Sequence, residues 1–332
     1  MRNYKLPINL TIIQLLFAWT VGAEIINIPD DEETIQGGID AAEDGDAVLV
    51  SPGEYVENIN FNGKAIAIIG NTENPGEVVI DGDSSGTVVT FDNGEGLQST
   101  LSGFTIQNGF VEQNGGGIRV SESSPRIYGC IIRNNSAGTR GGGISCEPNA
   151  SPSIVGCTIT ENESGSGGGG IWLGDNSSPE IFNCRILENY ARWNGGGVNM
   201  YIDCNPVITN CLIQNNSAGL HGGGIIVSQG CSPVIERCEI SHNLSDDRGG
   251  GIFIERQATP TFRNCLEHNN GSDGEMGLGL AIVENSAPRF INCNFNFSWT
   301  HLDWVIESFF ISASHPVFIN CILYYNSLPD IY

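Results

Sequence analysis

Residues 115–170 read GGGIRVSESSPRIYGCIIRNNSAGTRGGGISCEPNASPSIVGCTITENESGSGGGG, and this stretch decides the fold because one pattern recurs along it. A glycine triplet is followed by a proline, a cysteine lies five residues after the proline, and an asparagine lies five residues after the cysteine. The prolines are separated by 27 residues five times and then by 28 twice: Pro125, Pro152, Pro179, Pro206, Pro233, Pro260, Pro288 and Pro316. The cysteines keep step with them: Cys130, Cys157, Cys184, Cys211, Cys238, Cys265, Cys293 and Cys321. The asparagines are Asn135, Asn162, Asn189, Asn216, Asn243 and Asn270. A fixed period of this length indicates a solenoid in which each unit forms one coil.

Within each unit, short alternating apolar pairs lie between turn residues, which predicts brief strands rather than helices. The first strand follows the glycine triplet, as at Ile118 and Val120. The second follows the proline and points Ile127 inward, and the third carries the cysteine and Ile132. Equivalent strands of successive coils pair in parallel at about 4.8 Å, so that like residues stack. We therefore predict an all-β protein, a right-handed parallel β-helix with three short strands per coil of 27–28 residues.

The N-terminal residues 1–23 have the pattern of a secretory signal peptide. Arg2 and Lys5 form a basic start, an apolar stretch follows, and the small residues up to Ala23 suit a cleavage site. The alternatives are an uncleaved anchor and a buried first strand. We expect the mature chain to begin at Glu24 and to be secreted or displayed at the cell surface.

The remainder divides into two parts. Residues 24–110 are expected to form the N-terminal cap and first coils, with a short amphipathic helix from Thr34 to Ala42 covering the apolar end of the stack. Residues 111–332 are expected to form the regular coils. The chain stops eleven residues after Cys321, so we expect a C-terminal truncation. The alternative is that the segment 299–310 closes the stack.

The charge of the chain limits its partners. It has 14 Lys and Arg residues against 38 Asp and Glu residues, a net charge of −24. Such a surface repels phosphate groups, so nucleic acid is excluded as a partner. No segment after the signal peptide is apolar over the length needed to span a membrane.

Several segments resemble known families. Thr34-Ile35-Gln36, Pro52-Gly53-Glu54-Tyr55 and Asn62-Gly63-Lys64 resemble the entry segment of pectin-lyase-like right-handed β-helix proteins. Asn134-Asn135-Ser136-Ala137 before Gly141-Gly142-Gly143-Ile144 resembles the repeats of chlamydial polymorphic outer-membrane proteins. The resemblance covers almost everything after Ala23 and implies an extracellular β-helix. This superfamily contains lyases, glycosidases, epimerases and adhesins, so the fold does not choose among them.

Polysaccharide-cleaving members of this superfamily use carboxylates and a basic residue on an exposed sheet face, which the resemblance directs us to inspect. The outward positions of the first strand carry no carboxylate: Arg119, Ser145, Trp172, Asn199, Ile226, Phe253 and Ala281. Glycosidases need two carboxyl groups about 5–10 Å apart. Arg119 or Arg140 could act as the base of a lyase if acidic groups surrounded it. The sequence therefore favours a non-catalytic protein and leaves a polysaccharide lyase as the alternative.

A polar strip is the strongest candidate for ligand binding. The residues before the glycine triplets are Asn114, Arg140, Gly167, Asn194, His221 and Arg248. Together with Trp172, Trp193, Asn199 and Phe253 they are expected to offer aromatic faces and polar edges to a polysaccharide or cell-surface glycan. The alternative is ordinary surface decoration around a turn.

The sequence offers three further candidate groups. Asp246, Asp247, Asp273 and Glu275 could hold a calcium ion through oxygen ligands, although solvated turn charges explain them as well. The cysteine column is expected to fill the core rather than bind metal or form disulfides. Cys204 and Cys231 form a separate pair, 27 residues apart, that we single out for a disulfide.

Two polar positions inside the repeat also carry expectations. The recurring asparagines are expected to satisfy turn amides of the next coil. Glu267 falls where Ile240 and Phe295 point inward. We expect a bulge to turn it outward, with a buried functional acid as the alternative.

Overall fold

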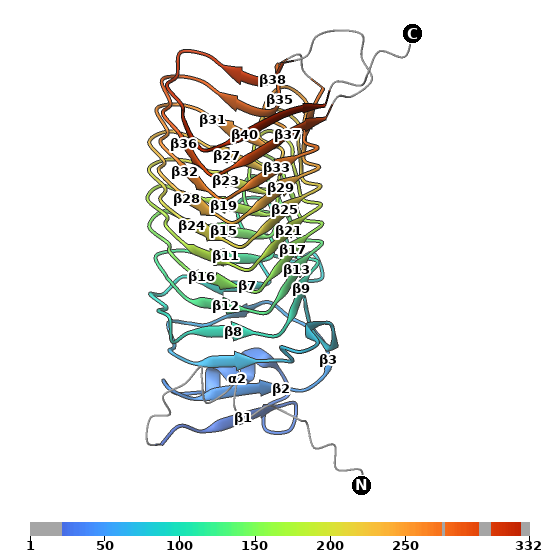
Figure 1. Cartoon of the computed structure of the whole chain (residues 1–332). Helices are drawn as coiled ribbons and strands as arrows, with labels where there is room; N and C mark the ends of the chain where they lie inside the picture. The colour runs from blue at the N-terminus through green and yellow to red at the C-terminus, as the bar shows by residue number, and fades with distance from the viewer. Residues whose placement is uncertain (1–21, 274–275, 299–306, 327–332) are drawn as a thin grey trace.

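The chain forms a single right-handed parallel solenoid, seen from the side in Figure 1. The computed structural model describes residues 22–273, 276–298 and 307–326. The predicted signal peptide lies almost wholly outside the described residues. Within those ranges, no helix is long and apolar enough to cross a membrane.

The strands build three long sheets and one narrow sheet, all paired in parallel within the sheets. Sheet A contains β1 (Ile25–Ile28), β2 (Ala47–Val50), β5 (Ala67–Ile69), β8 (Thr100–Ser102), β12 (Arg126–Tyr128), β16 (Ser153–Val155), β20 (Glu180–Phe182), β24 (Val207–Thr209), β28 (Val234–Glu236), β32 (Thr261–Arg263), β36 (Arg289–Ile291) and β39 (Val317–Ile319). Sheet B contains β3 (Gly53–Val56), β6 (Val78–Asp81), β9 (Thr105–Gln107), β13 (Ile131–Arg133), β17 (Thr158–Thr160), β21 (Arg185–Leu187), β25 (Leu212–Gln214), β29 (Glu239–Ser241), β33 (Leu266–His268), β37 (Asn294–Ser298) and β40 (Ile322–Asn326).

Sheet C contains β4 (Ile59–Asn60), β7 (Val89–Phe91), β11 (Ile118–Val120), β15 (Ile144–Cys146), β19 (Ile171–Leu173), β23 (Val198–Met200), β27 (Ile225–Val227), β31 (Ile252–Ile254), β35 (Met276–Ile282) and β38 (Glu307–Ile311). Sheet D contains the two-residue strands β10 (Phe110–Val111), β14 (Ser136–Ala137), β18 (Glu163–Ser164), β22 (Tyr190–Ala191), β26 (Ser217–Ala218), β30 (Leu244–Ser245) and β34 (Gly271–Ser272). The strands that follow the glycine triplets lie in sheet C, those that follow the prolines lie in sheet A, and those that follow the cysteines lie in sheet B. This arrangement confirms the predicted coil. Sheet D adds a fourth strand to each regular coil. The sequence did not predict it, because two residues are too few to show an alternation of apolar and polar side chains.

The core is a set of stacked columns. Ile127, Ile154 and Ile181 pair in register through sheet A and are buried. Toward the C-terminal end the column becomes aromatic, and the rings of Phe262 and Phe290 stack at 5.0 Å. Because each coil contacts only its neighbours, burial accumulates coil by coil, as expected for a solenoid.

The recurring asparagines form the buried hydrogen-bond ladder that the sequence predicts. The Nδ2 of Asn162 donates to Oδ1 of Asn189 in the next coil at 3.0 Å and to the carbonyl of Ile132 at 2.9 Å. The backbone N–H of Asn162 donates to the same Oδ1 at 3.1 Å. Each buried turn amide thus finds a partner, which removes the cost of an unsatisfied polar group.

The N-terminal end is covered by α2 (Ile35–Ala41), which confirms the predicted capping helix. Thr34 is its N-cap and accepts a hydrogen bond from the N–H of Gly37 at 3.0 Å. The carboxylate of Glu57 accepts from the free N–H groups of Ile35 and Gln36, both at 2.9 Å, so it satisfies two of the unpaired donors of the first turn. Ile35 and Ile39 are fully buried against the first coil. A η1 turn of 3-10 helix (Pro75–Glu77) precedes β6.

The cysteine column lies in the core, as predicted. Ten of the eleven cysteines are buried, and Cys321 is partly exposed. Their sulfurs sit against backbone carbonyls, as in Cys184, whose Sγ is 3.5 Å from the carbonyl oxygen of Ile154. The column acts as a set of small core fillers.

The expectation for Glu267 was wrong. The residue keeps its place between Ile240 and Phe295 in the register of sheet B, with no bulge there, and its side chain is only 2% exposed. Its Oε1 accepts a hydrogen bond from Asn270 at 2.5 Å, while Oε2 is buried without a hydrogen-bond partner. Burial raises the pKa of Glu267 to about 8, with the Asn270 hydrogen bond acting in the opposite direction. The parallel ladder keeps its register here, so the side chain stays inward despite its polarity.

Candidate functional site

The residues before the glycine triplets form one continuous row, here called the polar ladder: Asn114, Arg140, Gly167, Asn194, His221 and Arg248. Successive members are joined by parallel bridges, so that one member comes from each coil. The first glycine of each triplet has a positive φ, for example 66° at Gly141. This left-handed turn, which suits glycine, folds the ladder back over the outer face of sheet C. A Cβ at Gly141 would lie 2.8 Å from the Cβ of Ser145, which leaves no space for a side chain.

This turn corrects the prediction that the outward positions of sheet C are exposed. Trp172 is 3%, Asn199 8% and Phe253 2% exposed. Ser145 and Ile226 are buried as well. The ladder covers these side chains, so Trp172 and Phe253 cannot present open ring faces to a sugar. The sequence pattern missed this because it does not reveal the sign of φ at the glycines.

The buried rings instead support the ladder from beneath. The guanidinium carbon of Arg140 lies 4.9 Å from the ring centroid of Trp172 and 5.0 Å from that of Tyr201. The ring of His221 stacks on Phe253 with centroids 4.3 Å apart and planes 12° apart. Cation–π contacts and ring stacking hold these planar groups against the buried rings.

The gap at Gly167 is filled by a neighbour. A Cβ at Gly167 would lie 2.4 Å from Nδ2 of Asn199. That amide donates to the carbonyl of Asn194 at 3.1 Å. Asn199 therefore completes the ladder at the one position where the ladder has no side chain.

His221 and Arg248 share an acidic neighbour. Asp247 lies 3.5 Å from Nδ1 of His221 and 3.7 Å from Nε of Arg248. Burial lowers the pKa of His221, and the positive charge of Arg248 adds to this, whereas Asp247 opposes it. The arrangement favours the neutral imidazole. Nδ1 of His221, Nε of Arg248 and Oδ1 of Asn194 are buried polar atoms without a hydrogen-bond partner among the described residues.

Trp193 has an exposed aromatic ring beside the polar ladder. It directly precedes Asn194 in the ladder and is 50% exposed. Tyr190, in β22 of sheet D, is 40% exposed nearby in sequence. Of the three aromatic residues predicted for the strip, only Trp193 can stack directly on a ligand.

A second cluster surrounds Arg119 and was missed by the sequence analysis. Nη1 of Arg119 lies 3.7 Å from Asp92, and Nε lies 4.0 Å from Glu147. Glu147 also accepts hydrogen bonds from Asn114 at 3.1 Å and Ser145 at 3.2 Å. The two carboxylates come from the residue that follows a strand of sheet C, two positions beyond the column that carries Arg119. The sequence could have indicated this cluster, because Asp92, Glu147 and Glu255 all occupy the position directly after a strand of sheet C.

The structure describes three of the four residues predicted to bind calcium, and one of them, Asp273, is exposed. Asp246 is exposed, Asp247 is engaged with His221 and Arg248, and Glu275 lies outside the described residues. In the described part of the chain, no group of three or more His, Cys, Asp and Glu side chains is placed to hold a metal ion. Calcium binding stays a prediction.

Cys204 and Cys231 lie in adjacent coils, both fully buried. The N–H of Cys204 donates to Sγ of Cys231 at 3.2 Å. Both are thiols in the structure. The disulfide between them stays a prediction, and their position in neighbouring coils gives the spacing that it requires.

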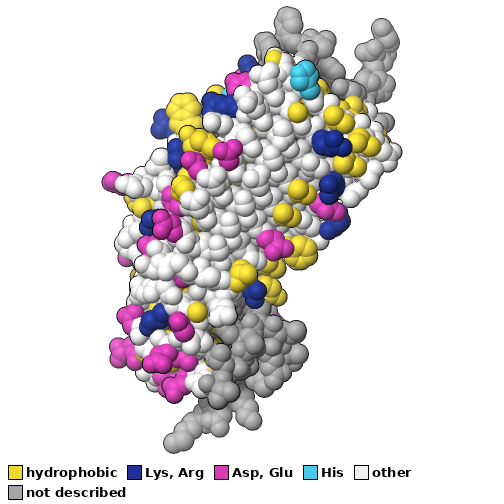
Figure 2. Space-filling model, turned by 90° about the vertical axis from the view of Figure 1, so that its left-hand side faces the viewer, with side chains coloured by type: hydrophobic (Ala, Val, Ile, Leu, Met, Phe, Trp, Pro, Cys, Tyr) yellow, Lys and Arg dark blue, Asp and Glu magenta, His cyan; other side chains and the backbone are white. Residues whose placement is uncertain are grey.

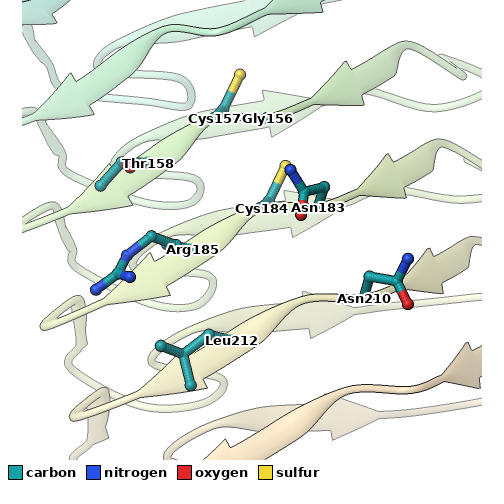
Figure 3. Close-up of a pocket in the computed structure, with 8 residues that line it drawn as sticks. All are labelled: Gly156, Cys157, Thr158, Asn183, Cys184, Arg185, Asn210 and Leu212. Carbon is teal, nitrogen blue, oxygen red and sulfur yellow. The ribbon is translucent and has the colours of Figure 1, made fainter.

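A cavity of about 370 Å³ lies at the corner between sheets A and B, lined by Gly156, Cys157, Thr158, Asn183, Cys184, Arg185, Asn210 and Leu212. Figure 3 shows Thr158, Arg185 and Leu212 directed away from the side to which the two sulfurs point. The lining contains no carboxylate and no histidine. It therefore lacks the imidazole and carboxyl groups that most often serve as general acid and base.

Charge is unevenly distributed over the surface. On the face shown in Figure 2, acidic side chains gather toward the N-terminal end, and the middle carries few charged groups. On this face an anionic ligand would meet less repulsion at the middle coils than at the N-terminal end.

Known proteins match the chain at the level of the fold. A family model described as "Right handed beta helix region" matches residues 56–221, 142–307 and 219–331. The solved structure of pectate lyase Pel9A is similar with a TM-score of 0.58 and 15% identity, over 86% of this chain and 78% of that chain. Pectin methylesterase from Aspergillus niger is similar with a TM-score of 0.50 and 14% identity, over 77% of this chain and 87% of that chain. No curated protein sequence matches.

Proposed function

Because this chain belongs to the right-handed β-helix family, we propose that it is an extracellular carbohydrate-binding protein whose polar ladder lies along a polysaccharide. In this proposal the protein is secreted or displayed at the cell surface, and it binds without cleaving. The two solved structures described above are named for enzymes of pectin. A glycan is therefore the ligand class to test first.

The observation that carries the proposal is the row of polar side chains in five of the six ladder positions, with Asn199 of the next coil filling the place at Gly167. Arg140 and His221 are held on buried rings, and the coils that carry them repeat at about 4.8 Å. That spacing is close to the length of a sugar unit in an extended chain. Each coil can thus hydrogen-bond one unit, and Trp193 can stack on the C–H face of another.

The rigidity of the ladder favours binding. The polar edges are fixed before a ligand arrives, so binding immobilises few side chains. Asp247 also holds His221 and Arg248 in place, at 3.5 Å from Nδ1 of His221 and 3.7 Å from Nε of Arg248.

A polysaccharide lyase is the second candidate, and the cluster around Arg119 is the observation that favours it. Asp92 and Glu147 flank the guanidinium on one lateral face. That is the acidic neighbourhood an arginine would need to act on a uronate sugar, with a cation bridging the acidic groups. Calcium would be the bridging ion in this second candidate.

The test is a panel of pectic, alginate and neutral polysaccharides, offered to the purified chain from Glu24 with and without calcium. Retention on a glycan without released product supports the binding proposal. Calcium-dependent release of unsaturated products would contradict it and support the lyase, and Arg119→Ala should then abolish release. Neither retention nor product on any member of the panel would contradict both candidates.

A further inference from the structure

Two histidines that are not part of the polar ladder are brought together at sheet B. His268 ends β33, and His242 follows β29 in the preceding coil. Their rings are 5.6 Å apart at the centroids, with planes at 83°. They occupy neighbouring columns and adjacent coils, so they meet on a diagonal.

Both imidazoles direct a nitrogen at one electropositive point. Nδ2 of Asn269 lies 3.2 Å from Nε2 of His242 and 3.1 Å from Nδ1 of His268. The amide NH₂ is a donor only, so both ring nitrogens present their lone pairs to it. The amide nitrogen occupies the place that a cation bound by two imidazoles would take.

The second nitrogen of His268 is held by a carboxylate. Nε2 of His268 lies 3.2 Å from Oε1 of Glu239, and with Nδ1 accepting from Asn269 the ring proton must be on Nε2. Ser241 donates to the same carboxylate oxygen at 3.3 Å, and Gln214 donates to Ser241 at 3.2 Å. A carboxylate behind a histidine fixes the tautomer and orientation of metal-binding imidazoles.

We propose that His242 and His268 form a two-imidazole site for a divalent transition-metal ion such as Ni²⁺, Cu²⁺ or Zn²⁺. Nε2 of His242 and Nδ1 of His268 are the ligands, and Glu239 is a positioning residue behind His268. The exposed side chain of Asn269 turns aside, and its amide oxygen or water completes the coordination.

The geometry suits such an ion with little change in the backbone. Metal–imidazole bonds are about 2.0–2.1 Å, which places the ring centroids on a tetrahedral ion about 5 Å apart. The observed separation is 5.6 Å. Each ring nitrogen therefore needs to approach the central point by about 1 Å, which rotation of the exposed His242 side chain allows. Imidazole ligands suit Zn²⁺, Cu²⁺ and Ni²⁺ rather than Ca²⁺ or Mg²⁺, and the net charge of −24 attracts cations.

The test uses the full chain without a histidine tag and Ni²⁺ as the probe, titrated by calorimetry at pH 7.5. The expected result is one equivalent of Ni²⁺ bound, with affinity reduced at least tenfold in His242→Ala and in His268→Ala. Glu239→Gln should weaken binding by about 10–100-fold, the range for a partner behind a metal ligand. His315→Ala, which changes an exposed histidine elsewhere, serves as the matched control and should bind as the unmodified chain does.

A second readout separates the site from general effects on folding. Sub-stoichiometric Ni²⁺ should broaden the ring-proton NMR signals of His242 and His268 before those of His315. The urea midpoint of each variant without metal reports its folding independently. The proposal is overturned if the His242→Ala, His268→Ala double variant binds Ni²⁺ as the unmodified chain does, or if the unmodified chain binds none. It stands apart from glycan binding, because the polar ladder and this site lie on different sheets.

Discussion

Replacing Glu267 with glutamine should stabilise the solenoid at neutral pH. In the folded chain, burial raises the pKa of Glu267 to about 8, against an ordinary value of 4.5. The folded state therefore holds the proton at pH 7, whereas the unfolded state has released it. This group supports folding fully below about pH 4.5, and its contribution is lost as pH rises toward 8.

The magnitude follows from the difference in pKa. Between pH 4.5 and 8, each pH unit lowers the free energy of unfolding by about 1.4 kcal/mol. At pH 7 it is therefore lower by about 3.4 kcal/mol than at pH 4.5. Glu267→Gln keeps the shape of the side chain and removes the titration. The free energy of unfolding of the variant should therefore exceed that of the unmodified chain by about 3 kcal/mol at pH 7, and by nothing at pH 4.

The assay is urea unfolding of both chains at pH 4, 5.5, 7 and 8.5, followed by circular dichroism. Glu180→Gln is the matched control, because Glu180 is exposed in β20 and should give no such dependence. A difference between Glu267→Gln and the unmodified chain that stays constant with pH would refute the reasoning. It would mean that Glu267 turns to solvent in solution.

Three further predictions follow from the site and the ladders. Asn189→Ala should lower the free energy of unfolding by about 3 kcal/mol, because it removes the acceptor of the buried N–H and Nδ2 of Asn162 and the side-chain donor to the carbonyl of Ile159. Asn205→Ala at the surface should change urea unfolding little. In the native chain a thiol reagent should react with the partly exposed Cys321 well before the ten buried cysteines; fast labelling of several thiols, counted by mass spectrometry, would contradict the buried column. Trp193→Ala should reduce retention on a bound glycan several-fold without altering the urea midpoint, since the side chain is half exposed; unchanged retention would remove Trp193 from the site.

Most of the fold could be predicted from the sequence because each coil of a solenoid repeats the same residue pattern. The spacing of Pro125, Cys130 and Asn135 from their counterparts placed the core columns and the asparagine ladder correctly. It also located the polar ladder, since the residue before each glycine triplet recurs in phase. In a solenoid, residues one period apart in the sequence stack on each other in adjacent coils, so the period predicts which residues are neighbours in space.

The sequence failed where contacts run across columns or depend on backbone conformation. The positive φ of Gly141 buries the outward face of sheet C, and nothing in a glycine triplet reveals that sign. Asp92 and Glu147 reach Arg119 from two columns away, and His242 reaches His268 along a diagonal. Glu267 was expected to turn outward because of its charge, but the register of its neighbours held it inward.

The central claim is that the polar ladder binds the glycan, and comparing two sets of substitutions tests it most directly. The ladder variant Arg140→Ala, Trp193→Ala, His221→Ala and a matched variant on sheets A and B, Arg126→Ala, Phe182→Ala, Gln214→Ala, are measured for affinity to the glycan retained in the panel. The account predicts that the ladder variant loses at least tenfold in affinity and that the matched variant binds normally, with both still folded. Equal affinity of the ladder variant and the unmodified chain would contradict the claim.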